Sequence, residues 1–151
     1  MKKFLGFVIT FCVLFMLLPI KGRAAQLDNA EVTYFADGSY MIDTVEALSA
    51  RTSGSVTGNR TRTYYSNDGK QSWKVVLTGV FSYTGSSSKC TSSSCNVTIY
   101  DSAWSYSSKS AGKSGNTATA SVTMEQVLHG VVGSRIPVSL TLSCDANGNL
   151  S

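Results

Sequence analysis

The residues of this chain that could carry reactive chemistry are few and far apart in the sequence. A single histidine, His129, precedes Gly130 in an expected turn. A Ser-His-Asp or Cys-His device would have to use this histidine, and no nucleophile motif such as GxSxG accompanies it. A position in a solvent-exposed turn accounts for this histidine without a catalytic role. The sequence therefore predicts that the protein is not an enzyme.

The acidic residues are expected to serve the fold rather than a reaction or a metal. Asp37, Asp68 and Asp145 stand in turn sequences, and Asp43 and Asp101 are expected as polar strand positions. Paired catalytic carboxylates need a fixed separation, which these settings do not indicate. The last of the three turns is similar to the start of a calcium loop but lacks its later ligands. With one histidine and no CxxC spacing, zinc is not expected either. We predict no metal and no cofactor.

Three cysteines lie beyond the N-terminal apolar segment, at Cys90, Cys95 and Cys144. In an exported protein they are expected to form one disulfide within the chain, which leaves one thiol over. Cys144 continues the apolar face of its expected strand, so it should point into the core. A bridge between Cys90 and Cys144 would stabilise the fold by about 4 kcal/mol on the loop-entropy model. We rank this bridge first, Cys95–Cys144 second and Cys90–Cys95 third.

Residues 1–24 have the layout of a secretory signal peptide. Lys2 and Lys3 precede an apolar run over residues 4–18, Pro19 ends the run, and small residues lead to a cut after Ala24 or Ala25. The run is short for a membrane span. We therefore expect a secreted, extracellular protein with one domain over residues 25–151 and no membrane attachment after cleavage.

Removal of this segment changes the charge of the chain. The sequence holds 13 Lys and Arg against 9 Asp and Glu, and four of the bases but none of the acids precede the cut. The remaining chain is therefore neutral, with its bases scattered. Nucleic-acid binding depends on clustered positive charge, so a nucleic-acid partner is not expected.

A period of two runs through most of the chain. In residues 71–83, Trp73, Val75, Leu77 and Phe81 alternate with more polar side chains. This alternation is typical of half-buried antiparallel strands. Similar patterns predict strands at 31–35, 39–48, 59–65, 96–102, 117–124 and 136–144. We predict an all-β protein with a single antiparallel β-sandwich, of which an immunoglobulin-like outline is one form, and a small β-barrel is the alternative.

Two aromatic residues in a polar stretch are the candidate binding residues. Trp73 falls on the apolar face of its strand and is expected in the core, whereas Trp104 and Tyr106 lie in a run rich in serine. Exposed aromatic rings stack on sugars and dominate protein interfaces. If the protein is a binding module, we expect Trp104 to contact the ligand and its replacement by alanine to reduce binding while leaving stability nearly unchanged. Burial of Trp104 is the alternative.

Two functions follow from these features. The first is a non-catalytic binding module for a surface glycan or protein. The alternative is a structural component of an envelope or biofilm that self-assembles through strand edges.

Three segments, at residues 63–69, 107–116 and 142–151, are similar to a family of short secreted proteins from clostridia and related Gram-positive bacteria, a family with no established function. The resemblance spans about residues 31–151. It implies a small exported β-protein of bacterial origin and supplies no catalytic residue.

Overall fold

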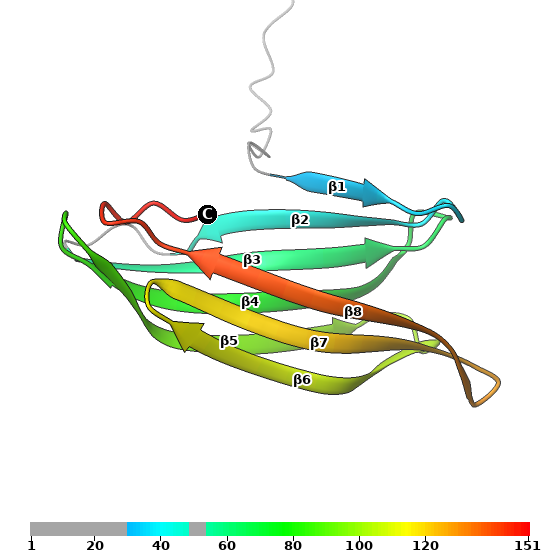
Figure 1. The fold of residues 1–151 in the computed structure, drawn as a ribbon. Helices are drawn as coiled ribbons and strands as arrows, with labels where there is room; N and C mark the ends of the chain where they lie inside the picture. The colour runs from blue at the N-terminus through cyan, green and yellow to red at the C-terminus, as the bar shows by residue number, and fades with distance from the viewer. Residues whose placement is uncertain (1–29, 49–53) are drawn as a thin grey trace, which may run out of the picture.

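The computed structural model describes residues 30–48 and 54–151, which form eight antiparallel strands and no helix (Figure 1). The signal peptide predicted at residues 1–24 lies outside the described residues. The strands are β1 (Glu31–Tyr34), β2 (Tyr40–Ala47), β3 (Ser55–Tyr65), β4 (Gln71–Tyr83), β5 (Ser88–Ile99), β6 (Trp104–Ser114), β7 (Thr117–Leu128) and β8 (Val131–Ser143). No helix in this part of the chain could cross a membrane.

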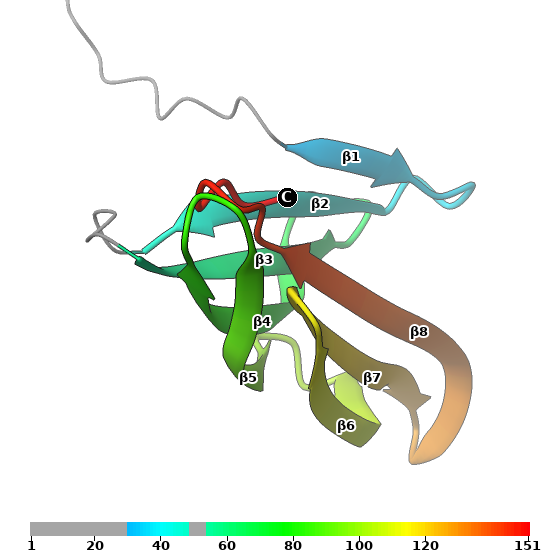
Figure 2. The ribbon, with the colours of Figure 1, turned by 60° about the vertical axis from the view of Figure 1, so that its left-hand side comes forward.

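The strands form two sheets that pack face to face. One sheet has the order β1-β2-β3-β4-β5 and the other the order β6-β7-β8. Figure 2 shows the three-stranded sheet as a second layer that crosses the first at an angle. The predicted antiparallel sandwich is confirmed, and the sheets do not close into a barrel. Within each sheet every strand pairs with its neighbours in sequence, which differs from the Greek-key order of an immunoglobulin domain.

The core lies between the two layers and follows the predicted alternation. Trp73, Val75, Leu77 and Phe81 of β4 are fully buried. The second sheet contributes the buried side chains of Ala118, Ala120, Val122, Met124, Val138, Leu140 and Leu142. Gly79 makes room within this row, because a Cβ atom there would lie 2.6 Å from the Phe81 ring. The expectation that Trp73 belongs to the core is confirmed.

Strand β6 is the element that the sequence pattern did not indicate. Only its first residue, Trp104, is buried, and nearly all the others are exposed and polar. The strand exists because its backbone pairs with β7 along its whole length, from Trp104 opposite Gln126 to Ser114 opposite Thr117. Strand β5 likewise begins at Ser88 rather than at residue 96. Neither stretch shows the apolar alternation that marks a half-buried strand.

The connections gather at the two ends of the sandwich. The β1–β2, β3–β4, β5–β6 and β7–β8 connections lie at one end, which we call the loop end (Figure 1). At the β7–β8 turn His129 has a φ of 52° and Gly130 a φ of 79°, as a two-residue hairpin of type I′ requires. The predicted exposed turn at His129 is confirmed. The C-terminal segment lies at the opposite end, where Ser151 exchanges two backbone hydrogen bonds with Ser143.

The predicted disulfide between Cys90 and Cys144 is not formed. The described part of the chain holds Cys90, Cys95 and Cys144 as buried thiols with no bridge between any two of them. The Cys90 thiol donates to the carbonyl oxygen of Ser92 at 3.3 Å, and the Cys144 thiol donates to that of Asp145 at 3.4 Å. The inward position expected for Cys144 is confirmed. Each of these two sulfur atoms therefore has a carbonyl partner close by in its own chain segment.

We predict that all three cysteines resist alkylation in the folded protein and react together on unfolding. Burial raises the pKa of the Cys90 and Cys95 thiols, and the thiolate is the reactive form. Intact-mass analysis after iodoacetamide treatment without reductant should show no adduct in buffer at pH 8 and three adducts in guanidinium. A disulfide-linked peptide pair in a non-reducing digest would contradict this prediction.

Candidate functional site: a groove at the loop end

An aromatic cluster lies in the interior next to the loop end. The Tyr64 ring stacks on Trp73 with centroids 5.2 Å apart and planes 5° from parallel. Trp104 meets Tyr64 at 5.1 Å and Trp73 at 6.0 Å, both at steep angles, and Phe35 meets Tyr64 at 6.0 Å. Tilted and offset ring pairs are the favoured aromatic geometries. Residues from β3, β4, β6 and the β1–β2 turn thus form one cluster.

Three turns at the loop end are stabilised by the same kind of hydrogen bond, from a backbone amide to an aspartate side chain. The Oδ1 atom of Asp37 accepts a hydrogen bond from the Ser39 amide, that of Asp68 from the Lys70 amide, and that of Asp101 from the Ala103 amide. An aspartate that binds the backbone two residues ahead forms an Asx turn. The turn roles predicted for Asp37 and Asp68 are confirmed. The strand position predicted for Asp101 is wrong, because Asp101 lies in the β5–β6 connection.

The turns and the aromatic cluster enclose a groove made of three adjoining hollows of about 330, 240 and 530 Å³. We call it the loop-end groove. The first two hollows share Asp37, Ser39, Tyr64, Trp104 and Gln126. The second and third share Ser66, Asn67, Ser72 and Asp101. The groove therefore runs from the inner edge of the sandwich, beside Ile136, across the β3–β4 and β5–β6 connections.

Polar groups of buried side chains open onto this groove. Tyr64, Ser72 and Trp104 are each more than nine-tenths buried and line it. In residues 30–48 and 54–151, Trp73 Nε1 is the only side-chain nitrogen or oxygen that is both sealed from solvent and without a hydrogen-bond partner. The hydroxyl groups of Tyr64 and Ser72 and the indole N–H of Trp104 also lack a partner among these residues, so they meet the solvent of the groove.

The groove carries negative charge. Hydrogen bonds from Ser39 hold the pKa of Asp37 below its usual value, and those from Lys70 and Ser66 lower the pKa of Asp68. Among the described residues Lys70 is the only basic one that lines the groove, and its Nζ atom lies 2.7 Å from Asp68 Oδ2. Asp37 and Asp101 form no ion pair of this kind among the described residues, although the charge of Asp101 also contributes to the raised pKa of Lys70.

The two candidate binding residues have different places in this arrangement. Trp104 is only 6% exposed, so the expectation of an exposed side chain is wrong; Tyr64 and Trp73, which are distant in sequence, cover it. Its remaining surface nevertheless lines the groove. Tyr106 is 43% exposed, lies with Lys109 Nζ 5.8 Å from its ring, and lines none of the three hollows. The structure does not bring Trp104 and Tyr106 into one site.

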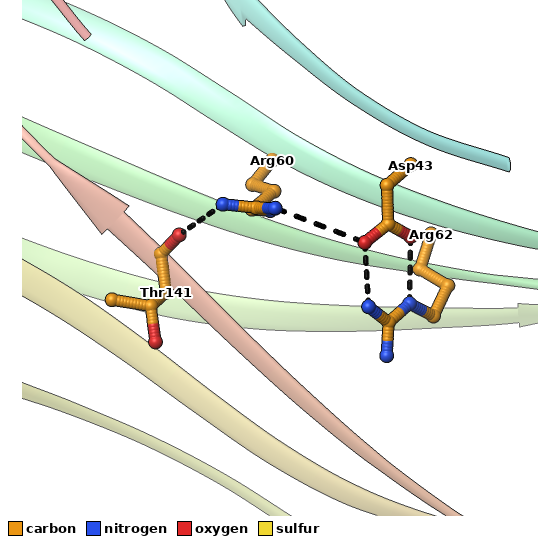
Figure 3. A network of polar contacts seen from close by, with 4 residues as sticks. All are labelled: Asp43, Arg60, Arg62 and Thr141. Carbon is orange, nitrogen blue, oxygen red and sulfur yellow. Dashed lines mark hydrogen bonds and ion pairs between the residues drawn. The ribbon is translucent and has the colours of Figure 1, made fainter. Parts of the chain in front are cut away.

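A second polar cluster joins the two sheets away from the groove (Figure 3). Arg62 binds Asp43 through two hydrogen bonds of 2.6 and 2.5 Å. Arg60 lies 3.9 Å from the same carboxylate and donates to the carbonyl oxygen of Thr141 on β8 at 3.1 Å. The hydrogen bond with Asp43 raises the pKa of Arg62. These contacts link β2, β3 and β8, so the cluster is a structural tie between the two sheets.

We did not predict this tie, although the sequence contains a signal for it. Val56, Arg60, Arg62 and Tyr64 share one face of β3 because they are separated by even numbers of residues. The buried residues at both ends of this row imply that the two arginines also point inward. Asp43, confirmed as a strand residue, lies opposite Arg62 in the next strand.

Among the described residues no three histidine, cysteine, aspartate or glutamate side chains gather as metal ligands. The groove is lined by aromatic surface, hydrogen-bond donors and carboxylates, which are groups that binding sites commonly use. Comparison of the chain with protein-family models, with curated proteins and with solved structures finds no match.

Proposed function

We propose that this protein is a secreted, non-catalytic binding module that holds an extracellular glycan in the loop-end groove. The observation that supports the proposal is that polar groups of Tyr64, Ser72 and Trp104 with no protein partner lie beside aromatic rings in one hollow. Small-molecule sites combine apolar walls with a few well-placed polar groups. A sugar presents both surfaces, since its C–H face packs on aromatic rings and its hydroxyl groups donate and accept hydrogen bonds.

The chemistry of the groove suits a polyhydroxylated ligand better than an apolar one. Hydroxyl groups of a ligand can accept from Tyr64, Ser72 and Trp104 and can donate to the free Oδ2 atoms of Asp37 and Asp101. Export, which the signal-peptide layout of residues 1–24 predicts, would bring the module to the glycans of a cell surface. The similarity to secreted clostridial proteins supports the same compartment.

We predict that the double variant Gln126→Ala/Asn67→Ala loses glycan binding without losing stability. Gln126 lines the first two hollows and Asn67 the second and third, and neither residue belongs to the buried core. Loss of two hydrogen bonds at about 1 kcal/mol each should weaken binding at least about tenfold. The mature protein and the variant would be compared on arrays of cell-wall and mucin glycans, with thermal unfolding measured alongside.

Asn96→Ala is the matched control, because Asn96 lies exposed on the outer face of β5, opposite Val76. This variant should bind as the wild type does. If the mature protein binds no glycan, or if the double variant binds as tightly as Asn96→Ala, the loop-end groove is not a glycan site.

Self-assembly through strand edges is the second candidate function, and the β7–β8 hairpin favours it. Leu128, Val131 and Val132 are exposed there, and within the described residues β8 has a strand partner only on its β7 side. Arg60 and the C-terminal segment cover the last part of that open edge, which leaves the part near the hairpin turn available. If the protein self-assembles, analytical ultracentrifugation should show oligomers whose fraction increases with protein concentration.

A further inference from the structure

This inference rests on the proposed function. If the loop-end groove binds a glycan, the charges that line the groove indicate which charge that glycan carries. Asp37, Asp68 and Asp101 line the groove against the single base Lys70. Asp68 and Lys70 neutralise each other at 2.7 Å. Two carboxylate charges therefore remain in excess, although the chain without residues 1–24 is neutral.

The two excess carboxylates flank the aromatic part of the groove. The middle hollow of about 240 Å³ is lined by Asp37 and Asp101 together with Tyr64 and Trp104, and by no basic residue. Each of these carboxylates uses Oδ1 in its own turn, and its Oδ2 atom has no partner among the described residues. Cations are attracted both by carboxylates and by the faces of electron-rich rings at short range.

The charge alone does not define a site, but the buried polar groups beside it supply an independent observation. Tyr64, Ser72 and Trp104 are more than nine-tenths buried and line the same hollow. Their hydroxyl and indole N–H groups have no protein partner in the described part of the chain. Because these groups meet the solvent of the groove, a ligand that lies between the two aspartates can displace that water and bind them through its hydroxyl oxygens.

We propose that the ligand is a glycan of amino sugars whose amines are free rather than acetylated, with an ammonium group held between Asp37 and Asp101. The hydroxyl groups of the sugar meet Tyr64, Ser72 and Trp104, and the ammonium group meets the two carboxylates. Acidic glycans are repelled from this groove. An acetylated amine carries no charge and forms no ion pair with the aspartates.

The test compares two probes of equal length, the β-1,4-linked tetramer of glucosamine and the tetramer of N-acetylglucosamine. Calorimetric titration of the mature protein at pH 6, where the amines are protonated, should show about tenfold tighter binding of the glucosamine tetramer at 20 mM salt. The preference should shrink at 500 mM salt because screening acts on the ion pairs.

The variant Asp37→Asn/Asp101→Asn keeps the Oδ1 acceptors of both turns and removes both charges. It should bind the two tetramers with similar affinity. Asp145→Asn is the matched control, because Asp145 forms the same kind of turn with Asn147 at the opposite end of the sandwich, and it should keep the preference for glucosamine.

The outcomes separate this inference from the proposed function. Equal binding of the two tetramers by the wild type, with loss in Gln126→Ala/Asn67→Ala, would overturn the ammonium site and leave the glycan groove in place. Binding of neither tetramer would also overturn the ammonium site, and the glycan arrays would then decide the proposed function. Tighter binding of a lysine-containing tetrapeptide than of the glucosamine tetramer would contradict the sugar ligand.

Discussion

Replacement of Trp73 by alanine should lower the free energy of unfolding by about 3–5 kcal/mol, the largest effect expected for a single substitution in this protein. Trp73 is fully buried and contacts Tyr64 and Trp104, so alanine would leave a large cavity at the centre of the aromatic cluster. A domain of this size has only about 5–15 kcal/mol in total. Urea unfolding followed by circular dichroism measures the loss.

Two further variants and one control make this prediction specific. Trp73→Phe fills most of the space and removes the buried Nε1 group that has no partner, so it should cost far less than alanine. Trp104→Ala should also destabilise, by about 3 kcal/mol, because the side chain is buried against the same rings. Tyr106→Ala, at an exposed position of the same strand, is the control and should change little. An unfolding midpoint for Trp104→Ala equal to that of Tyr106→Ala would show that Trp104 is not structural.

Replacement of Asp43 by alanine should lower the free energy of unfolding by about 3 kcal/mol. The Asp43 side chain is 9% exposed, and its removal leaves Arg62, which is 23% exposed, and Arg60 close together without an ion-pair partner. Only the weaker influence of the Glu31 charge on Arg62 then remains. This loss lies at the low end of the range for buried ion pairs, because the arginines keep some contact with water. Chemical unfolding measures it directly.

The double variant Asp43→Leu/Arg62→Met tests whether charge is the cause. Replacement of Asp43 and Arg62 by apolar side chains removes the Arg62 charge and leaves only Arg60, which keeps its hydrogen bond to Thr141, so the double variant should be more stable than Asp43→Ala. Lys70→Ala is the control, because it breaks only the exposed pair between Lys70 and Asp68 and should have little effect on stability. If Asp43→Ala is as stable as Lys70→Ala, the tie between the sheets contributes nothing to stability.

The fold could be predicted where one face of a strand is buried. Strand β4 matches its predicted range of 71–83 because buried and partly exposed residues alternate along most of its length. Strand β6 could not be predicted in this way, since it packs almost no side chain into the core and is defined by backbone pairing with β7. Alternation of apolar and polar residues indicates that one face of a strand is buried. It does not indicate a strand that is stabilised mainly by backbone hydrogen bonds.

The site was harder to predict than the fold, because its surroundings are not local in sequence. The polar neighbours of Trp104 suggested exposure, but the rings that bury it come from β3 and β4. The turn roles of Asp37 and Asp68 followed from adjacent Asp-Gly sequences. That these turns lie at the same end as Asp101 and Trp104 depends on the antiparallel order of the strands, which local patterns do not determine.

The central claim, that the loop-end groove is the binding site, can be tested through the two tryptophan side chains of the protein. Their indole N–H groups give separate signals in a ¹H–¹⁵N spectrum. Trp104 lines the groove, whereas Trp73 Nε1 is sealed from solvent. On titration with the glycan that the arrays select, the Trp104 indole signal should shift and its exchange with water should slow, while the Trp73 signal changes much less. A saturating titration that leaves the Trp104 indole unchanged and shifts residues on the outer faces of the sheets would contradict the account.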